Sequence, residues 1–107
     1  MILSSPLPPF WPPALVQEFC RRWKIVELSL FGSALRDDFR PDSDVDLLVR
    51  YAPDAAWSLL DHARMERELA GILGYEVDLV SRTAVEASPN WIRRQEILST
   101  ARALYAA

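Results

Sequence analysis

Asp44 and Asp46 form an Asp-x-Asp pair at the start of an apolar run, residues 45–49, and this spacing suits metal chemistry. Side chains two apart on a strand project from the same face, roughly 6 to 7 Å apart along it. Two carboxylates held that close repel each other unless a cation lies between them. Mg²⁺ suits the pair, because it takes oxygen ligands and is often held by one or two carboxylates together with phosphate oxygens. The pair therefore predicts a magnesium site of the kind that serves nucleotidyl transfer.

A second candidate element, Gly32-Ser33, precedes this pair by ten residues and closes the apolar, β-branched run at 25–31. The run predicts a buried strand that ends in a turn. A glycine turn lets backbone N–H groups approach phosphate oxygens, and the Ser33 hydroxyl adds a donor. Arg36 and Arg40 are the candidate cationic contacts to a triphosphate.

A third carboxylate is expected on a further strand, residues 76–80. Asp78 lies inside this apolar run, whereas Glu76 lies two positions earlier at its edge, so we favour Asp78. It would act as a metal ligand or as a general base, and the sequence leaves both roles open.

The elements that must position these residues alternate between strands and helices. A chain of 107 residues, half of them hydrophobic, suits one domain with a modest core. The expected order is an α/β sandwich with a small mixed sheet packed with helices. We predict a proline-rich arm at 1–13 and a domain at 14–107, with helices at 14–23, 57–73 and from 88–89 onward, and strands at 25–31, 44–49 and 76–80.

Apolar spacing predicts which helical positions face the core. One side of each expected helix carries apolar residues at intervals of three or four, and Gly74 is expected to end the second helix in a left-handed conformation. Trp57 and Trp91 are both expected at helix starts, with at least one packed in the core. The expected core positions are Leu15, Phe19 and Trp23 in the first helix, Leu59, Ala63, Ala70 and Leu73 in the second, and Ile97, Ala101 and Leu104 in the last.

The Gly-Ser turn, the Asp-x-Asp pair and the later Asp together resemble the minimal nucleotidyltransferases, the smallest members of the DNA polymerase beta-like superfamily. The resemblance extends from about Ile25 to the C-terminus. It implies transfer of a nucleotide from ATP with two Mg²⁺ ions. The residues that it assigns are Gly32, Ser33, Arg36 and Arg40 for the triphosphate, and Asp44, Asp46 and Asp78 for the metals and catalysis.

Two positions depart from the pattern that the resemblance implies. Ala34 stands where many relatives carry arginine, and Asp37 replaces a frequent glycine. Loss of the arginine would weaken nucleotide binding or change how the triphosphate is held. All the expected metal carboxylates are present, so an active enzyme is the favoured interpretation.

The acceptor follows from the resemblance alone. Stand-alone members of this kind are similar to antitoxins that transfer AMP to a tyrosine of a HEPN-type toxin and silence its ribonuclease. The alternatives are an antitoxin that neutralises its toxin by binding alone, and a small-molecule nucleotidyltransferase. The third is disfavoured, because a chain of this length leaves no room for a separate acceptor-binding domain.

Composition bears on partners and location. A net charge of −3, with no continuous basic stripe, disfavours nucleic acid as the acceptor. The proline-broken start has neither a basic segment nor an apolar span, so cytoplasmic location without a membrane anchor is expected. The single Cys20 is expected to be a packing residue, and a catalytic pair with His62 has little support. Pairing of two copies through the proline-rich arm is left open.

Overall fold

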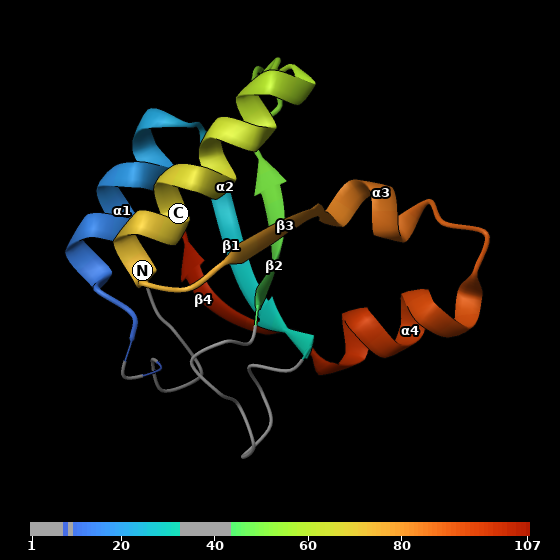
Figure 1. Ribbon diagram of the computed structural model, residues 1–107. Helices are drawn as coiled ribbons and strands as arrows, with labels where there is room; N and C mark the ends of the chain where they lie inside the picture. The colour runs from blue at the N-terminus through green and yellow to red at the C-terminus, as the bar shows by residue number, and fades with distance from the viewer. Residues whose placement is uncertain (1–7, 9, 33–43) are drawn as a thin grey trace.

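The computed structural model describes residue 8 and residues 10–32 and 44–107. Within that part of the chain, a mixed sheet is flanked by helices (Figure 1). Its strands are β1 (Ile25–Phe31), β2 (Val45–Tyr51), β3 (Val77–Ser81) and β4 (Arg102–Ala106). The helices are α1 (Pro13–Arg22), α2 (Leu59–Leu73), α3 (Arg82–Glu86) and α4 (Trp91–Thr100). The predicted α/β class with a small mixed sheet is confirmed.

The sheet has the strand order β3-β2-β1-β4, which places β1 and β2 at its centre. β1 is antiparallel to both β2 and β4, whereas β2 and β3 run parallel. The C-terminal end of β1 therefore lies beside the N-terminal ends of β2 and β3. We call this end of the sheet, where these three strands begin or end, the site edge. This arrangement brings the expected site residues from three separate stretches of sequence to one place.

One face of the sheet carries the main hydrophobic core, which α1 and α2 cover. Alternate strand residues such as Leu28, Leu47 and Leu79 point to this face and are almost fully buried. From the helices, Phe19 and Met65 complete the packing with no exposed surface. The Cys20 side chain is also fully buried here, as expected for a packing residue.

The opposite face carries a smaller cluster beneath α3 and α4. Phe31 and Leu48 from the strands meet Val85 of α3 and Ile97 of α4. Figure 1 shows these two helices projecting from the sheet on the side away from α1 and α2. By strand alternation, Asp46 lies on this same face, two residues before Leu48 on β2.

The end of the chain differs from the expectation. The last helix was expected to begin at Ser88-Pro89 and to bury Leu104, but α4 ends at Thr100 and Leu104 lies in strand β4. Leu104 is buried by pairing of β4 with β1, a contact across most of the sequence. Helix α4 begins later because the Asn90 side chain, rather than Ser88, caps it by accepting from the Arg93 amide at 3.2 Å.

The second helix begins later than expected and turns a different side to the core. Ser58 and Asp61 form a capping box, so α2 starts at Leu59 rather than at Trp57. Leu59 is 86% exposed and the stripe that faces the core is Met65, Leu69 and Leu73, so the expected burial of Leu59 and Ala63 was wrong. Gly74 ends the helix with φ of 81°, as predicted.

In the first helix, Phe19 is buried as expected, but Leu15 is 54% exposed. The face toward the core is instead Val16, Phe19 and Cys20. Trp11, within the expected arm, is only 5% exposed and packs in the main core. The last part of the arm therefore contributes to the folded core, while the division at residue 13 stays a prediction.

The two tryptophans expected at helix starts have different environments. Trp57 is partly buried, meets Trp23 edge to face at 5.1 Å between ring centroids and donates to the Trp23 carbonyl at 2.8 Å. Trp91 is 60% exposed at the start of α4. No helix in the described ranges is long and apolar enough to cross a membrane.

Candidate functional site

Gly32 and Asp46 lie side by side at the edge where β1 ends and β2 begins. Phe31 pairs with Asp46 across the two strands, so the next residue, Gly32, stands beside the Asp46 carboxylate. A Cβ added at Gly32 would lie 3.2 Å from Cγ of Asp46 and still closer to its Oδ2. Gly32 also has φ of 77°, in the left-handed region that side chains disfavour. The turn therefore requires glycine for both space and conformation.

Asp46 and Asp78 occupy paired positions on the parallel strands β2 and β3. Residues in register on neighbouring parallel strands point to the same face, so both carboxylates lie on the face that carries α3 and α4. Asp44 is exposed directly before β2, and Asp78 is exposed on β3. The structure thus brings Gly32, Asp46 and Asp78 to one edge, with Asp44 two positions from Asp46.

The donor set at this edge consists of carboxylate oxygens, which suits Mg²⁺ rather than a softer metal. The described residues contain no group of three or more Asp, Glu, His or Cys side chains close enough to form a complete metal cage. Magnesium bound to nucleotide needs only one or two carboxylates, because phosphates and water supply its other ligands. The arrangement therefore fits a metal that enters together with a triphosphate.

Ser33, Arg36 and Arg40, predicted to contact the triphosphate, lie outside the described residues, as do Ala34 and Asp37. Their assignments stay predictions. The His62 side chain lies 3.5 Å from Glu66 on α2, whereas Cys20 is buried in the main core. Burial raises the pKa of the Cys20 thiol to about 12, which is unsuited to a nucleophile.

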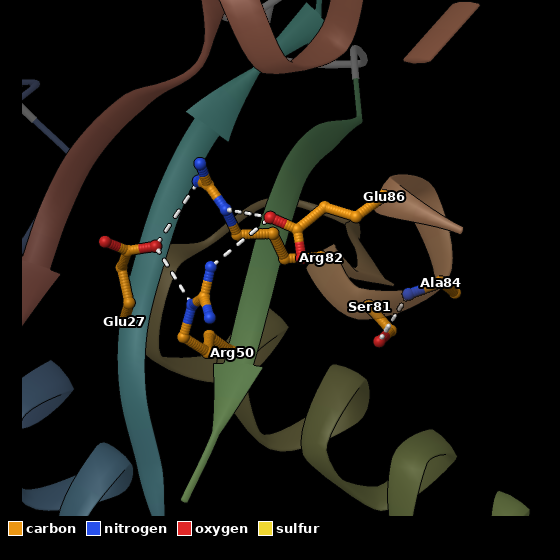
Figure 2. A network of polar contacts seen from close by, with 6 residues as sticks. All are labelled: Glu27, Arg50, Ser81, Arg82, Ala84 and Glu86. Atoms are coloured by element: carbon orange, nitrogen blue, oxygen red, sulfur yellow. Dashed lines mark hydrogen bonds and ion pairs between the residues drawn. The ribbon is translucent and has the colours of Figure 1, made fainter. Parts of the chain in front are cut away.

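A group of four charged residues that the sequence did not predict lies farther along the face that carries α3 and α4 (Figure 2). Glu27 of β1 contacts Arg82 at 3.3 Å and Arg50 of β2 at 3.9 Å. Glu86 of α3 lies 3.5 Å from Arg50 and 3.6 Å from Arg82, so each arginine meets both glutamates. The group ties α3 to the sheet, and partial exposure of all four residues limits its contribution to stability. The local sequence signal that could have indicated α3 is Ser81, which caps this helix by accepting from the Ala84 amide at 3.3 Å.

The outer side of α4 carries a hollow of about 410 Å³ lined by Trp91, Arg94, Gln95, Leu98 and Ser99. It contains none of the site carboxylates. The adjacent Ile92 is 62% exposed, so this helix end presents apolar surface. No described residue shows what would cover it, and we assign it no role.

The fold and this edge of Gly and Asp residues define a nucleotidyltransferase of the minimal class. The family model described as "Nucleotidyltransferase domain" matches residues 13–104. The chain therefore belongs to the nucleotidyltransferase domain family, and the predicted family and enzyme class are confirmed at that level.

Individual relatives agree with this placement. The chain is 35% identical over 71 residues to the protein adenylyltransferase MntA of Thermococcus cleftensis, covering 66% of this chain and 70% of that protein. It is 39% identical over 61 residues to a protein of Methanocaldococcus jannaschii assigned as a protein adenylyltransferase. That second match covers 57% of this chain and 63% of the relative, so the matched stretch spans less than two thirds of it.

Solved structures share the fold. A structure assigned as a minimal nucleotidyltransferase superposes with a TM-score of 0.62 and 39% identity, covering 82% of this chain and 84% of the other. A toxin–antitoxin structure with AMP-PNP superposes with a TM-score of 0.63 over 86% of this chain and 71% of that chain, and its 22% identity supports the fold alone.

Proposed function

We propose that this chain is an antitoxin that transfers AMP from ATP to a tyrosine hydroxyl of a HEPN-family toxin and releases pyrophosphate. The observation that carries the proposal is the edge at which Gly32 stands against Asp46, with Asp78 in register on the next strand. That edge combines a close-approach turn with carboxylates on one face, as phosphoryl chemistry requires.

The relatives support the choice of nucleotide and acceptor. The Thermococcus protein is named a protein adenylyltransferase, and the 22% identical structure contains the ATP analogue AMP-PNP. A further solved complex, with 19% identity to this chain and a TM-score of 0.54, holds a tri-AMPylated HEPN toxin of Shewanella oneidensis with its MNT antitoxin. We extend these properties to the present chain as a proposal.

In the proposed reaction the acceptor oxygen attacks the α-phosphorus of ATP. A phosphorus–oxygen bond to the acceptor forms as the bond to the bridging oxygen breaks, and the β- and γ-phosphates leave as pyrophosphate. Gly32 and Ser33 would hold the triphosphate through backbone N–H groups and the serine hydroxyl, with Arg36 and Arg40 as cationic contacts.

The three carboxylates would supply the metal ligands or a general base. Asp44 and Asp46 would bind Mg²⁺ together with phosphate oxygens, and Asp78 would serve as a further metal ligand or take the acceptor proton as general base. Two Mg²⁺ ions would supply Lewis acidity, which stabilises charge on the α-phosphate and lowers the pKa of the acceptor hydroxyl. In either role, Asp78 must keep a fixed position relative to Asp46.

The test is transfer of label from α-labelled ATP in the presence of Mg²⁺ and the protein that the neighbouring gene encodes, which the proposal expects to be a HEPN toxin. The matched control is the double variant Asp44→Ala/Asp46→Ala, and intact mass measures the product. One or more added AMP masses on the toxin, lost in the control, would support the proposal. A stable complex with no added mass would replace it with an antitoxin that acts by binding alone, and label on a small molecule would point to the third alternative.

A further inference from the structure

We propose that Glu66 is a positioning residue, which holds the backbone of β3 from its outer edge and thereby fixes Asp78 relative to Asp46. The inference rests on the proposed function, because that function places Asp78 in the catalytic site. Glu66 lies on α2, twelve positions before Asp78 in the sequence, and no pattern in the sequence marks it as a site residue.

β3 is an edge strand whose only partner is β2 in the sheet of the described residues. The Val45 amide donates to the Glu76 carbonyl at 2.8 Å, which fixes the parallel ladder. Because alternate residues of a parallel strand bond to the same neighbour, the backbone of Asp78 faces β2 and the amide of Leu79 points away from the sheet.

Glu66 accepts this outward amide. The Leu79 N–H donates to Glu66 Oε2 at 2.8 Å, in a partly buried location between α2 and the sheet edge. A hydrogen bond to a carboxylate is stronger than one between neutral groups, and partial burial shields it in part from competing water. The same Oε2 lies 3.5 Å from Nε2 of His62, one helical turn earlier.

The bond acts on the residue directly after Asp78. The Leu79 side chain is 3% exposed in the main core, so the core holds residue 79 on one face and Glu66 holds its amide at the outer edge. The Asp78 side chain projects to the opposite, exposed face. Among the described residues, Glu66 is the side chain that bonds to the outer edge of β3 at this point, so without it the strand could shift within its plane.

Such a shift matters because transfer depends on the placement of the carboxylates. A misplacement of about 1 Å in a catalytic constellation costs up to about 10²-fold in rate. Loss of one edge contact should give a smaller displacement. We therefore expect Glu66→Ala to lower kcat about 10-fold, with little change in the KM for ATP, since the triphosphate contacts lie on the turn after β1.

Two conservative variants separate contact from charge. Glu66→Gln keeps an oxygen at the same reach and removes the charge, whereas Glu66→Asp keeps the charge and shortens the reach by one methylene. If Glu66 acts by positioning β3 through the Leu79 contact, Glu66→Gln should keep most of the wild-type kcat and Glu66→Asp should not. The opposite order would mean that Glu66 acts through its charge, and would overturn the proposal.

A matched control lies two positions away on the same helix. Glu68 pairs with Arg22 and accepts from Trp23 Nε1 at 3.1 Å, so Glu68→Ala also removes side-chain contacts of α2 but none to β3. It should leave kcat unchanged while lowering thermal stability. A kcat as low as that of Glu66→Ala would show that general loosening of α2, not the position of Asp78, sets the rate.

A readout independent of activity keeps this inference separate from the proposed function. In the full chain, Glu66→Ala should speed hydrogen exchange at the Leu79 amide at least about 10-fold and shift the ¹³Cγ resonance of Asp78, whereas Glu68→Ala should change neither. If the wild-type chain transfers no label, the proposed function fails and these resonances alone decide the positional claim. An unchanged Asp78 resonance in folded Glu66→Ala, or an unchanged kcat in an active enzyme, would overturn it.

Discussion

The two faces of the sheet differ in how completely they are covered. The face beneath α1 and α2 carries most of the buried side chains, whereas the face beneath α3 and α4 carries a cluster around Phe31, Leu48, Val85 and Ile97. Asp46 and Asp78 lie on the second face, with Asp78 exposed and Asp46 partly exposed. One face therefore supplies most of the hydrophobic packing, and the other presents the carboxylates of the candidate site.

Such a division lets chemistry and stability be altered separately. Carboxylates placed in the main core would carry a large desolvation cost, whereas at the edge of the second face they stay accessible to water and metal. β2 serves both faces, because its successive side chains alternate between them. Variants along β2 are therefore the sharpest way to test the comparison.

The largest expected effect is the loss of activity in Asp46→Ala. Removal of this carboxylate should lower transfer of label at least about 10³-fold, because the proposed function makes Asp46 a ligand of the metal that stabilises the transition state. The free energy of unfolding should stay the same or rise, since the substitution removes the repulsion between the Asp46 carboxylate and the nearby carboxylates of Asp44 and Asp78. Label transfer and urea unfolding measure the two effects, and a variant that unfolds more easily than wild type would contradict the division between the faces.

Leu47 and Leu48 offer a matched comparison of the two faces. Both are leucines on β2 with at most 1% exposure, but Leu47 packs in the main core and Leu48 in the smaller cluster. Leu47→Ala should cost about 4 kcal/mol and Leu48→Ala about 2 to 3 kcal/mol, because the smaller cluster can relax around the cavity. Urea denaturation checks the order, and equal costs would mean that both faces are packed with the same rigidity.

Gly32 and Gly74 separate the cost of backbone conformation from the cost of crowding the site. Both have φ near 80°, but a Cβ at Gly74 meets no atom within 4 Å, whereas one at Gly32 meets the Asp46 carboxylate. Each alanine variant should lose about 1 kcal/mol of stability from the left-handed conformation. Only Gly32→Ala should also lower transfer, by about 10²-fold. Equal activities would show that the close approach of Gly32 to Asp46 has no catalytic role.

The smallest expected effect is a pH dependence from the main core. Burial holds the pKa of the Cys20 thiol at about 12, against 9.0 for an exposed thiol. Between these values the unfolded chain has lost the proton and the native chain keeps it, so stability falls as pH rises, by up to about 1.4 kcal/mol per pH unit. Tyr51, whose pKa burial also raises to about 12, adds to the loss above pH 10. Cys20→Ala should flatten the slope between pH 9 and 10, and an unchanged slope would assign it to other groups.

The site edge was predictable because its signals are local. β-branched and apolar runs marked β1, β2 and β3, the Asp-x-Asp spacing marked the shared face, Gly32 marked a turn, and Gly74 marked a left-handed helix end. Each of these signals is read within a few residues of the element that it specifies. Asp78 was predicted on a further strand, but the parallel pairing that places it beside Asp46 was not predicted.

The misjudged parts depend on contacts between distant segments. Residues 102–106 have a composition compatible with helix, and only pairing with β1 makes them strand β4. Helix α3 has five residues, too few for a helical period to show. The position of the sheet decides which side of α2 faces the core. Leu59 is apolar but lies at the exposed start of this helix, so its predicted burial was wrong. The role proposed for Glu66 was not predicted, because its partner is a backbone amide and no sequence pattern reveals such a contact.

The position of β4 has a consequence for synthesis of the chain on the ribosome. β1 is complete by residue 31, but its partner on one side is β4 at Arg102–Ala106, which is made only after residues 32–101. Until those residues leave the exit tunnel, that side of β1 has unsatisfied backbone groups and offers an edge to other nascent chains. Pairing of β1 on this side therefore waits for synthesis of residues 102–106, and the long separation between β1 and β4 should also slow refolding of the isolated protein.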